Sequence, residues 1–173
     1  MTDESLLSGA RVELRPVRPS DVEKLAAILA TPEVSRWWGL PPTPDALNRD
    51  LAEEDAAHFA ITVDGEVAGM IQYHEEQDPG YRSAGIDIFV APEYQERGLG
   101  TDAIRTLARH LIADRGHHRL TIDPAADNVR AIAAYRKVGF RPVGVMRQYE
   151  RGLDGTWHDG LLMDLLRGEF VDR

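Results

Sequence analysis

The sequence predicts one mixed α/β (α+β) domain over residues 11–170, with a mostly antiparallel sheet of six or seven strands flanked by about four helices. Three observations predict this class. Asp64-Gly65 and Asp154-Gly155 each separate two strand-like runs, which is a strong hairpin signal. Segments between such runs carry apolar residues at helical spacing. A chain of 173 residues is long enough to bury one well-packed core.

In the first part of the chain, alternating polar and apolar residues predict a strand, and cap residues predict helices. Residues 11–17 alternate polar and apolar side chains and predict a strand. Ser20 and Glu23 form a capping box that begins a helix. Thr31, a cap residue followed by proline, begins a second helix that leads into a loop rich in glycine and proline. A third, short helix is expected over residues 44–54.

The middle of the chain predicts antiparallel strands followed by a long helix. Runs on both sides of Asp64-Gly65 form a hairpin, and residues 85–90 read as a buried strand because β-branched and aromatic residues fill it. A strand over 119–124 and a helix ending near Gly139 follow. Two final strands are expected over these ranges: 141–150 and about 157–167.

Charge and composition narrow the classes of function. The formal net charge is −9 and no basic face is evident, so we expect no nucleic-acid partner and favour cationic ones. No apolar run approaches the roughly 20 residues of a membrane span. The first ten residues lack the features of a signal peptide. We therefore expect a cytoplasmic protein with no membrane partner. Residues 1–10 are expected to form a flexible lead-in. A homodimer is possible only in the sense that dimers are the commonest assembly.

The stretch QERGLGT, residues 95–101, predicts a phosphate site at the start of a helix. Its glycines allow close backbone approach, and Arg97 adds a cation. A tight turn without a ligand is the alternative. A dinucleotide fingerprint is disfavoured because a polar segment separates the strand from the glycines and antiparallel strands precede it.

Two motifs resemble the GCN5-related N-acetyltransferases (GNAT superfamily). QERGLGT after GIDIFV resembles the acetyl-CoA loop of that superfamily. The stretch NVRAIAAYRKVGF resembles its second signature, with Asn128, Ala131, Tyr135, Gly139 and Phe140 at the matching positions. The resemblance implies a splay between the fourth and fifth strands, residues 86–90 and 119–123, where the cofactor pantetheine pairs with the first of them.

The resemblance also implies roles for individual residues. It assigns acetyl-CoA as cofactor, with no metal, and Tyr135 as the acid that protonates the departing thiolate, a core tyrosine being the alternative. The residues that it places at the cofactor are Ile88, Phe89, Val90, Gln95, Glu96, Arg97, Gly98, Leu99, Gly100, Thr101, Asn128, Ala131 and Tyr135. Because the chain has no cysteine to carry an acetyl group, attack is expected to be direct, within a ternary complex.

A narrower resemblance concerns the acceptor. WWG near 37–39 and DPGYRSAGID at 78–87 are similar to bacterial aminoglycoside 6′-N-acetyltransferases. This implies a cationic small-molecule amine as substrate, bound by Trp37, Trp38, Asp87, Asp123 and Asp159. Asp87, a charge within an apolar strand, is the expected general base. For Asp123 a turn cap remains the alternative, and for Trp38 a loop packed on the core.

The C-terminal stretch departs from that narrower pattern. RGLDGTWHDGLLMDLL is more similar to superfamily members that acetylate protein N-termini or small amines. A polyamine, a protein N-terminus or a hydroxylysine unit of a siderophore therefore stays open as acceptor. A non-catalytic acyl-CoA sensor is the alternative from another class. Histidine spacing shows no metal-binding pattern.

Overall fold

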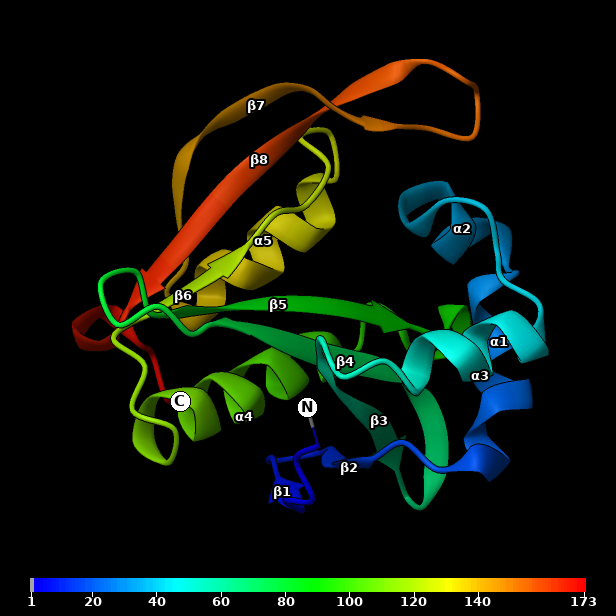
Figure 1. The fold of residues 1–173 in the computed structure, drawn as a ribbon, viewed down its shortest axis with the longest axis horizontal. Helices are drawn as coiled ribbons and strands as arrows, with labels where there is room; N and C mark the ends of the chain where they lie inside the picture. Colours follow the sequence, from blue (N-terminus) through cyan, green and yellow to red (C-terminus); the bar gives the residue numbers. More distant parts are fainter. Residues whose placement is uncertain (1) are drawn as a thin grey trace.

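A computed structural model describes residues 2–173, and its elements follow the predicted order (Figure 1). No helix among these residues is both long and apolar enough to cross a bilayer. The strands are β1 (Leu7–Ser8), β2 (Glu13–Pro16), β3 (Ala57–Val63), β4 (Glu66–Glu76), β5 (Ser83–Val90), β6 (Arg119–Ile122), β7 (Arg141–Arg151) and β8 (Trp157–Leu166). The α-helices are α1 (Val22–Leu29), α2 (Pro32–Trp38), α3 (Pro44–Leu51), α4 (Leu99–Ala113) and α5 (Val129–Val138).

The strands form one mixed sheet in the order β1-β2-β3-β4-β5-β6-β8-β7. Every neighbouring pair is antiparallel except β5 and β6, which run parallel. The mixed, mostly antiparallel class is confirmed. Two counts differ from the prediction, since the described residues form eight strands and five α-helices. The additional strand is β1, whose two residues lack the alternating run that a sequence pattern needs.

β5 and β6 separate soon after they pair, as the family resemblance implies. Their register joins only Ala84 to Leu120 and Gly85 to Thr121. β5 then continues to Val90 while β8 and β7 diverge from it (Figure 1). The last residues of β5 therefore have no strand partner on this side within the described chain. We call this opening the splay.

Two apolar cores cover the two faces of the sheet. One joins α4 and α5 to strand residues such as Phe59, Ile71 and Ile86. The other joins α1, α2 and α3 to Met70 and Phe89. Neighbouring residues of one strand thus face different cores, because side chains alternate along a strand. Each large, fully buried side chain contributes about 1.5–3 kcal/mol of transfer free energy.

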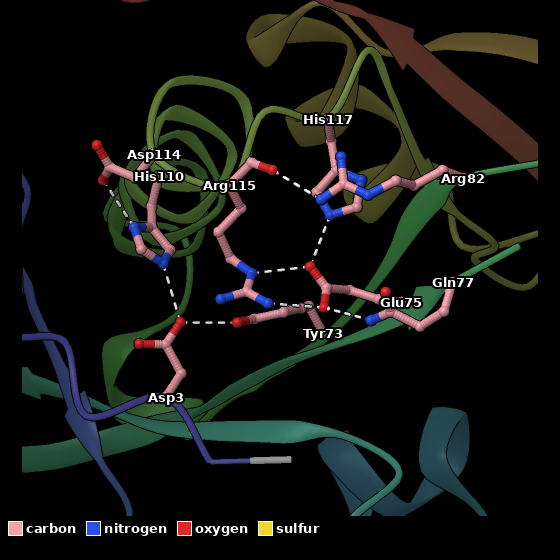
Figure 2. Close-up of polar contacts among 9 residues, drawn as sticks. All are labelled: Asp3, Tyr73, Glu75, Gln77, Arg82, His110, Asp114, Arg115 and His117. Carbon is pink, nitrogen blue, oxygen red and sulfur yellow. Dashed lines mark hydrogen bonds and ion pairs between the residues drawn. The ribbon is translucent and has the colours of Figure 1, made fainter. Parts of the chain in front are cut away.

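The expected lead-in makes defined contacts from Asp3 onward, whereas Met1 lies outside the described residues. β1 pairs with β2 through Leu7 and Leu14. The carboxylate of Asp3 accepts hydrogen bonds from the Tyr73 hydroxyl at 2.7 Å and from Nε2 of His110 at 2.9 Å (Figure 2). The segment is thus held against β4 and α4 by polar contacts between residues far apart in the sequence.

Candidate active site

The glycine loop leads into the N-terminus of α4. Gly98 is the N-cap residue, with a φ of 75° in the left-handed region, which glycine adopts without strain. Glu96, Arg97 and Gly98 are exposed, so the segment that leads into this 15-residue helix lies at the surface, beside the unpaired N–H groups of its first turn. This geometry suits a bound anion.

Three arginines surround this loop. The Arg97 guanidinium lies 5.5 Å from the centre of the Tyr94 ring. Arg11, from the start of the chain, donates to the Arg97 carbonyl, and Arg130 lies 3.7 Å from the Glu96 carboxylate. Sequence reasoning named only Arg97, because neither other arginine belongs to the glycine motif.

The edge of β5 presents alternate backbone groups to the splay. The Ala91 N–H bonds to the Ala68 carbonyl of β4, so by alternation Phe89 faces β4, whereas Ile88 and Val90 face the splay. Both of those carbonyls are engaged. Ile88 accepts from the Trp38 indole at 3.2 Å and Val90 accepts from the Gln95 side chain at 2.8 Å.

The residues of the second signature begin α5. Asn128 is its N-cap, and its side chain accepts from the Ala131 N–H at 3.3 Å. The helix ends at Gly139, whose φ of 115° requires glycine. Asn128 thus has a structural task of its own, and its predicted contact with pantetheine stays a prediction.

Asp87 is a half-buried carboxylate on β5. Burial raises its pKa, the hydrogen bond that Gln72 donates at 3.2 Å partly offsets this, and the charge of Asp123 raises the pKa further. Asp123 follows the last residue of β6 and accepts a 2.7 Å hydrogen bond from the Tyr149 hydroxyl. The two predicted carboxylates therefore lie within electrostatic range of each other across the splay.

Tyr135 lies on α5 and is 8% exposed. Burial raises its pKa first, and the charges of Asp87 and Asp123 add to that rise. Its hydroxyl has no hydrogen-bond partner among residues 2–173. A phenol with a raised pKa keeps its proton at neutral pH, and here the proton is not committed to another side chain.

The two tryptophans lie differently. Trp38 packs edge-on against Phe89, with ring centres 5.0 Å apart. It also lines a cavity of about 340 Å³ whose walls include Gln72 and three acids, Asp50, Glu53 and Asp55. Trp37 is half-buried, and the Arg36 guanidinium lies 4.5 Å from its ring centre.

Asp159 is exposed, and its carboxylate caps the backbone of the β7–β8 hairpin. Its Oδ1 accepts from the Gln148 N–H at 2.8 Å.

Two residues that sequence reasoning did not name contact the acids of the splay. Gln72 donates to Asp87, and Tyr149 donates to Asp123. Gln72 could be found only from the pairing of β4 with β5, and Tyr149 only from a contact between residues far apart in the sequence. Among residues 2–173, no group of three or more His, Cys, Asp or Glu side chains could hold a metal ion.

Comparisons with known proteins agree with this geometry. A family model described as an acetyltransferase (GNAT) domain matches residues 11–141. The spermidine N(1)-acetyltransferase of Escherichia coli K12 is 25% identical over 170 residues, covering 95% of this chain and 90% of the relative. The aminoglycoside N(6′)-acetyltransferase type 1 of Klebsiella pneumoniae is 31% identical over 159 residues, covering 80% and 78%.

A solved structure adds a ligand-bound comparison. The aminoglycoside acetyltransferase AAC(6′)-Ib, in complex with paromomycin and acetyl-CoA, superposes with a TM-score of 0.76. It is 28% identical, and the match covers 92% of this chain and 95% of that one.

Proposed function

The chain belongs to the acetyltransferase (GNAT) domain family and is an N-acetyltransferase; on that premise we propose that it transfers an acetyl group from acetyl-CoA to an amine of a cationic small molecule. The preferred acceptor is an aminoglycoside, at its 6′-amino group. The observation that carries this proposal is the pair of carboxylates, Asp87 and Asp123, at the splay. Within residues 2–173 neither forms an ion pair with a lysine or arginine, so a cation from a substrate can complete the site.

The residues around the glycine loop fit acetyl-CoA. The open N-terminus of α4 and the cations Arg11 and Arg97 suit a pyrophosphate. The N–H groups of Ile88 and Val90 point by alternation into the splay, where an extended pantetheine arm can add to the strand edge. Phe89, also predicted at the cofactor, turns its backbone toward β4 and packs its ring against Trp38. The remaining predicted cofactor residues lie along the glycine loop and at the start and along the length of α5, and their contacts are part of this proposal.

Bound acetyl-CoA supplies an activated thioester. Asp87, whose pKa burial raises, removes the proton from the reacting ammonium group, directly or through water. Tyr135 holds a proton on Oη that it gives to the departing sulfur. A positioned general base contributes about 10²–10⁴-fold to the rate.

The acceptor side supports a polycationic substrate. Trp38 and Gln72 line the cavity that also carries Asp50, Glu53 and Asp55. Gln72 connects this cavity to the splay because it donates to Asp87. With a formal net charge of −9, the protein also attracts cations at long range.

Spermidine is the second candidate acceptor. The similarity to a spermidine N(1)-acetyltransferase extends over 95% of this chain, against 80% for the aminoglycoside enzyme. Both molecules are polycationic amines, so the same carboxylates would serve either. The regiochemistry of transfer separates the two proposals.

An assay of thiol release from acetyl-CoA tests the proposal. The acceptors are a kanamycin-type aminoglycoside, spermidine, a peptide with a free N-terminus and hydroxylysine. We expect turnover with the aminoglycoside, and with spermidine if the second candidate holds. Turnover with peptide alone would contradict the polycationic acceptor. Acetyl-CoA binding without thiol release from any amine would instead identify a sensor.

A further inference from the structure

The β7–β8 hairpin contains an irregularity beside the splay. Met146 pairs with Gly160 and Glu150 with His158, so three residues of β7 lie opposite one residue of β8, Asp159. The Gln148 backbone has a φ of 49°, and its N–H is held by the Asp159 carboxylate at 2.8 Å. Bulges of this kind redirect side chains next to functional sites.

The side chain that this bulge redirects is Tyr149. Its ring lies over Gly160, where an added Cβ would come 3.0 Å from the ring Cδ2. Its hydroxyl donates to Oδ2 of Asp123 at 2.7 Å, although the side chain is 50% exposed. The tyrosine side chain thus connects the β7–β8 hairpin to Asp123, the residue that follows β6.

Backbone bonds fix the two ends of this contact relative to each other. The Ala126 N–H donates to the Asp159 carbonyl at 2.9 Å, and the Leu161 N–H donates to the Pro124 carbonyl at 2.8 Å. The loop that follows Asp123 is therefore attached to the strand that carries Gly160. The Tyr149–Asp123 contact is set by the main chain on both sides.

The contact leaves Asp123 able to bind a cation. Tyr149 is a neutral donor that engages Oδ2, whereas no hydrogen bond to Oδ1 occurs within the described chain. Asp87 lies near enough for its charge to act on Tyr149 as well.

We infer that Tyr149 is a positioning residue of the acceptor site, which holds the Asp123 carboxylate oriented so that its remaining oxygen receives a second ammonium group of the acceptor. This inference rests on the proposed function, in which Asp87 serves the amine that reacts. The pair then selects acceptors with two or more cationic groups over monoamines. Specificity arises because a monoamine leaves Asp123 without a partner.

The test is Tyr149→Phe, which keeps the ring over Gly160 and removes only the hydroxyl. Losing a hydrogen bond to a charged group weakens binding by roughly tenfold. We expect KM for a kanamycin-type aminoglycoside and for spermidine to rise by about that factor. We expect kcat to stay within about threefold and KM for acetyl-CoA to stay constant. Tyr81→Phe, at an exposed tyrosine outside the site, is the matched control and should change none of these values.

A double-mutant cycle shows whether the tyrosine acts through the carboxylate. In an Asp123→Asn background, Tyr149→Phe should have little further effect, because the group that it positions is already altered. The full tenfold effect in that background would overturn the inference, as would an unchanged KM in the single variant. Gly160→Ala, which displaces the ring without removing the hydroxyl, should raise KM in the same direction.

Calorimetry without acetyl-CoA separates this inference from the proposed function. Titration of spermidine into the wild-type protein and Tyr149→Phe measures amine binding whether or not turnover occurs. A protein that releases no thiol yet binds spermidine about tenfold more weakly after the substitution would refute the function and support the positioning role. Equal dissociation constants, or no binding to the wild-type protein, would refute the positioning role.

Discussion

Strand β4 contributes side chains to two polar clusters, which differ in whether their acidic residues are paired with cations. On the side of α4 lie Asp3, Tyr73, Glu75, His110, Asp114, Arg115 and His117, which we call the α4 network (Figure 2). We define the splay cluster as Asp87, Asp123, Tyr135 and Tyr149. Gln72, on the other side of the strand, donates to Asp87 of this cluster. Because side chains alternate along a strand, Gln72 faces away from Tyr73 and Glu75.

The two clusters differ in whether their carboxylates are paired with basic side chains. In the α4 network, Glu75 bonds to Arg115 at 2.8 Å and to His117 at 2.7 Å, and the Arg115 hydrogen bonds are the main cause that lowers its pKa to about 2. One exception is Nδ1 of His117, which is buried without a partner among the described residues. In the splay cluster, burial without a paired cation raises the pKa of Asp87. Matched acids stabilise the fold, whereas unmatched ones are available for chemistry.

The largest expected effect is on catalysis. Asp87→Asn removes the general base and should lower kcat by about 10²–10⁴-fold with saturating acceptor. Steady-state thiol release measures this. Asp45→Asn, at an exposed position on α3, is the control and should keep full activity. Near wild-type turnover in Asp87→Asn would remove this residue from the mechanism.

The α4 network should instead govern stability. Glu75→Gln removes the counter-charge of Arg115 and one carboxylate oxygen that contacts the fully buried His117. We expect a loss of about 3 kcal/mol in unfolding free energy, or roughly 6–12 °C in Tm. Thermal unfolding measures the change, and kcat below the new Tm should be unaffected. Glu76→Gln, the exposed neighbour on β4, should change stability by less than about 0.5 kcal/mol.

Acidification should affect the two clusters in sequence. Glu75 has a folded-state pKa of about 2 against an ordinary 4.5, so its stabilisation is complete above the higher value and is lost as pH falls toward the lower one. Asp87 has a raised pKa, so it loses its charge at a higher pH than an ordinary aspartate. Activity should therefore fall before the fold does. Parallel pH profiles of kcat and circular dichroism test this order, and coincident profiles would contradict it.

The smallest expected effect is a gain in stability. Because the folded-state pKa of Asp87 is raised, its ionised form lowers stability at neutral pH. Asp87→Asn should therefore raise the unfolding free energy by about 0.5–1 kcal/mol, with Gln72 turned to present its oxygen. Urea unfolding measures the change. A loss of stability would place Asp87 with the structural acids of the α4 network.

The sequence predicted the parts of this comparison that are local. The glycine loop, the start of α5 and an acid within β5 are readable from short patterns, because caps, turns and alternation act over a few residues. Asp159 accepts a hydrogen bond from the hairpin backbone, and its place in the acceptor cleft stays a prediction. Tyr149, Gln72 and Arg11 were missed because their partners lie many residues away. Only the strand register and the packing of the folded chain bring such pairs together.

One paired measurement tests whether the splay cluster serves catalysis and the α4 network serves stability. Turnover and thermal unfolding are recorded for Asp87→Asn and Glu75→Gln with the same acceptor. We expect Asp87→Asn to lose at least about 10²-fold in kcat without losing stability, whereas Glu75→Gln should lose stability and keep its turnover. If Asp87→Asn unfolded more easily while remaining active, or if Glu75→Gln lost turnover at full stability, catalysis and stability would not be divided between the two clusters.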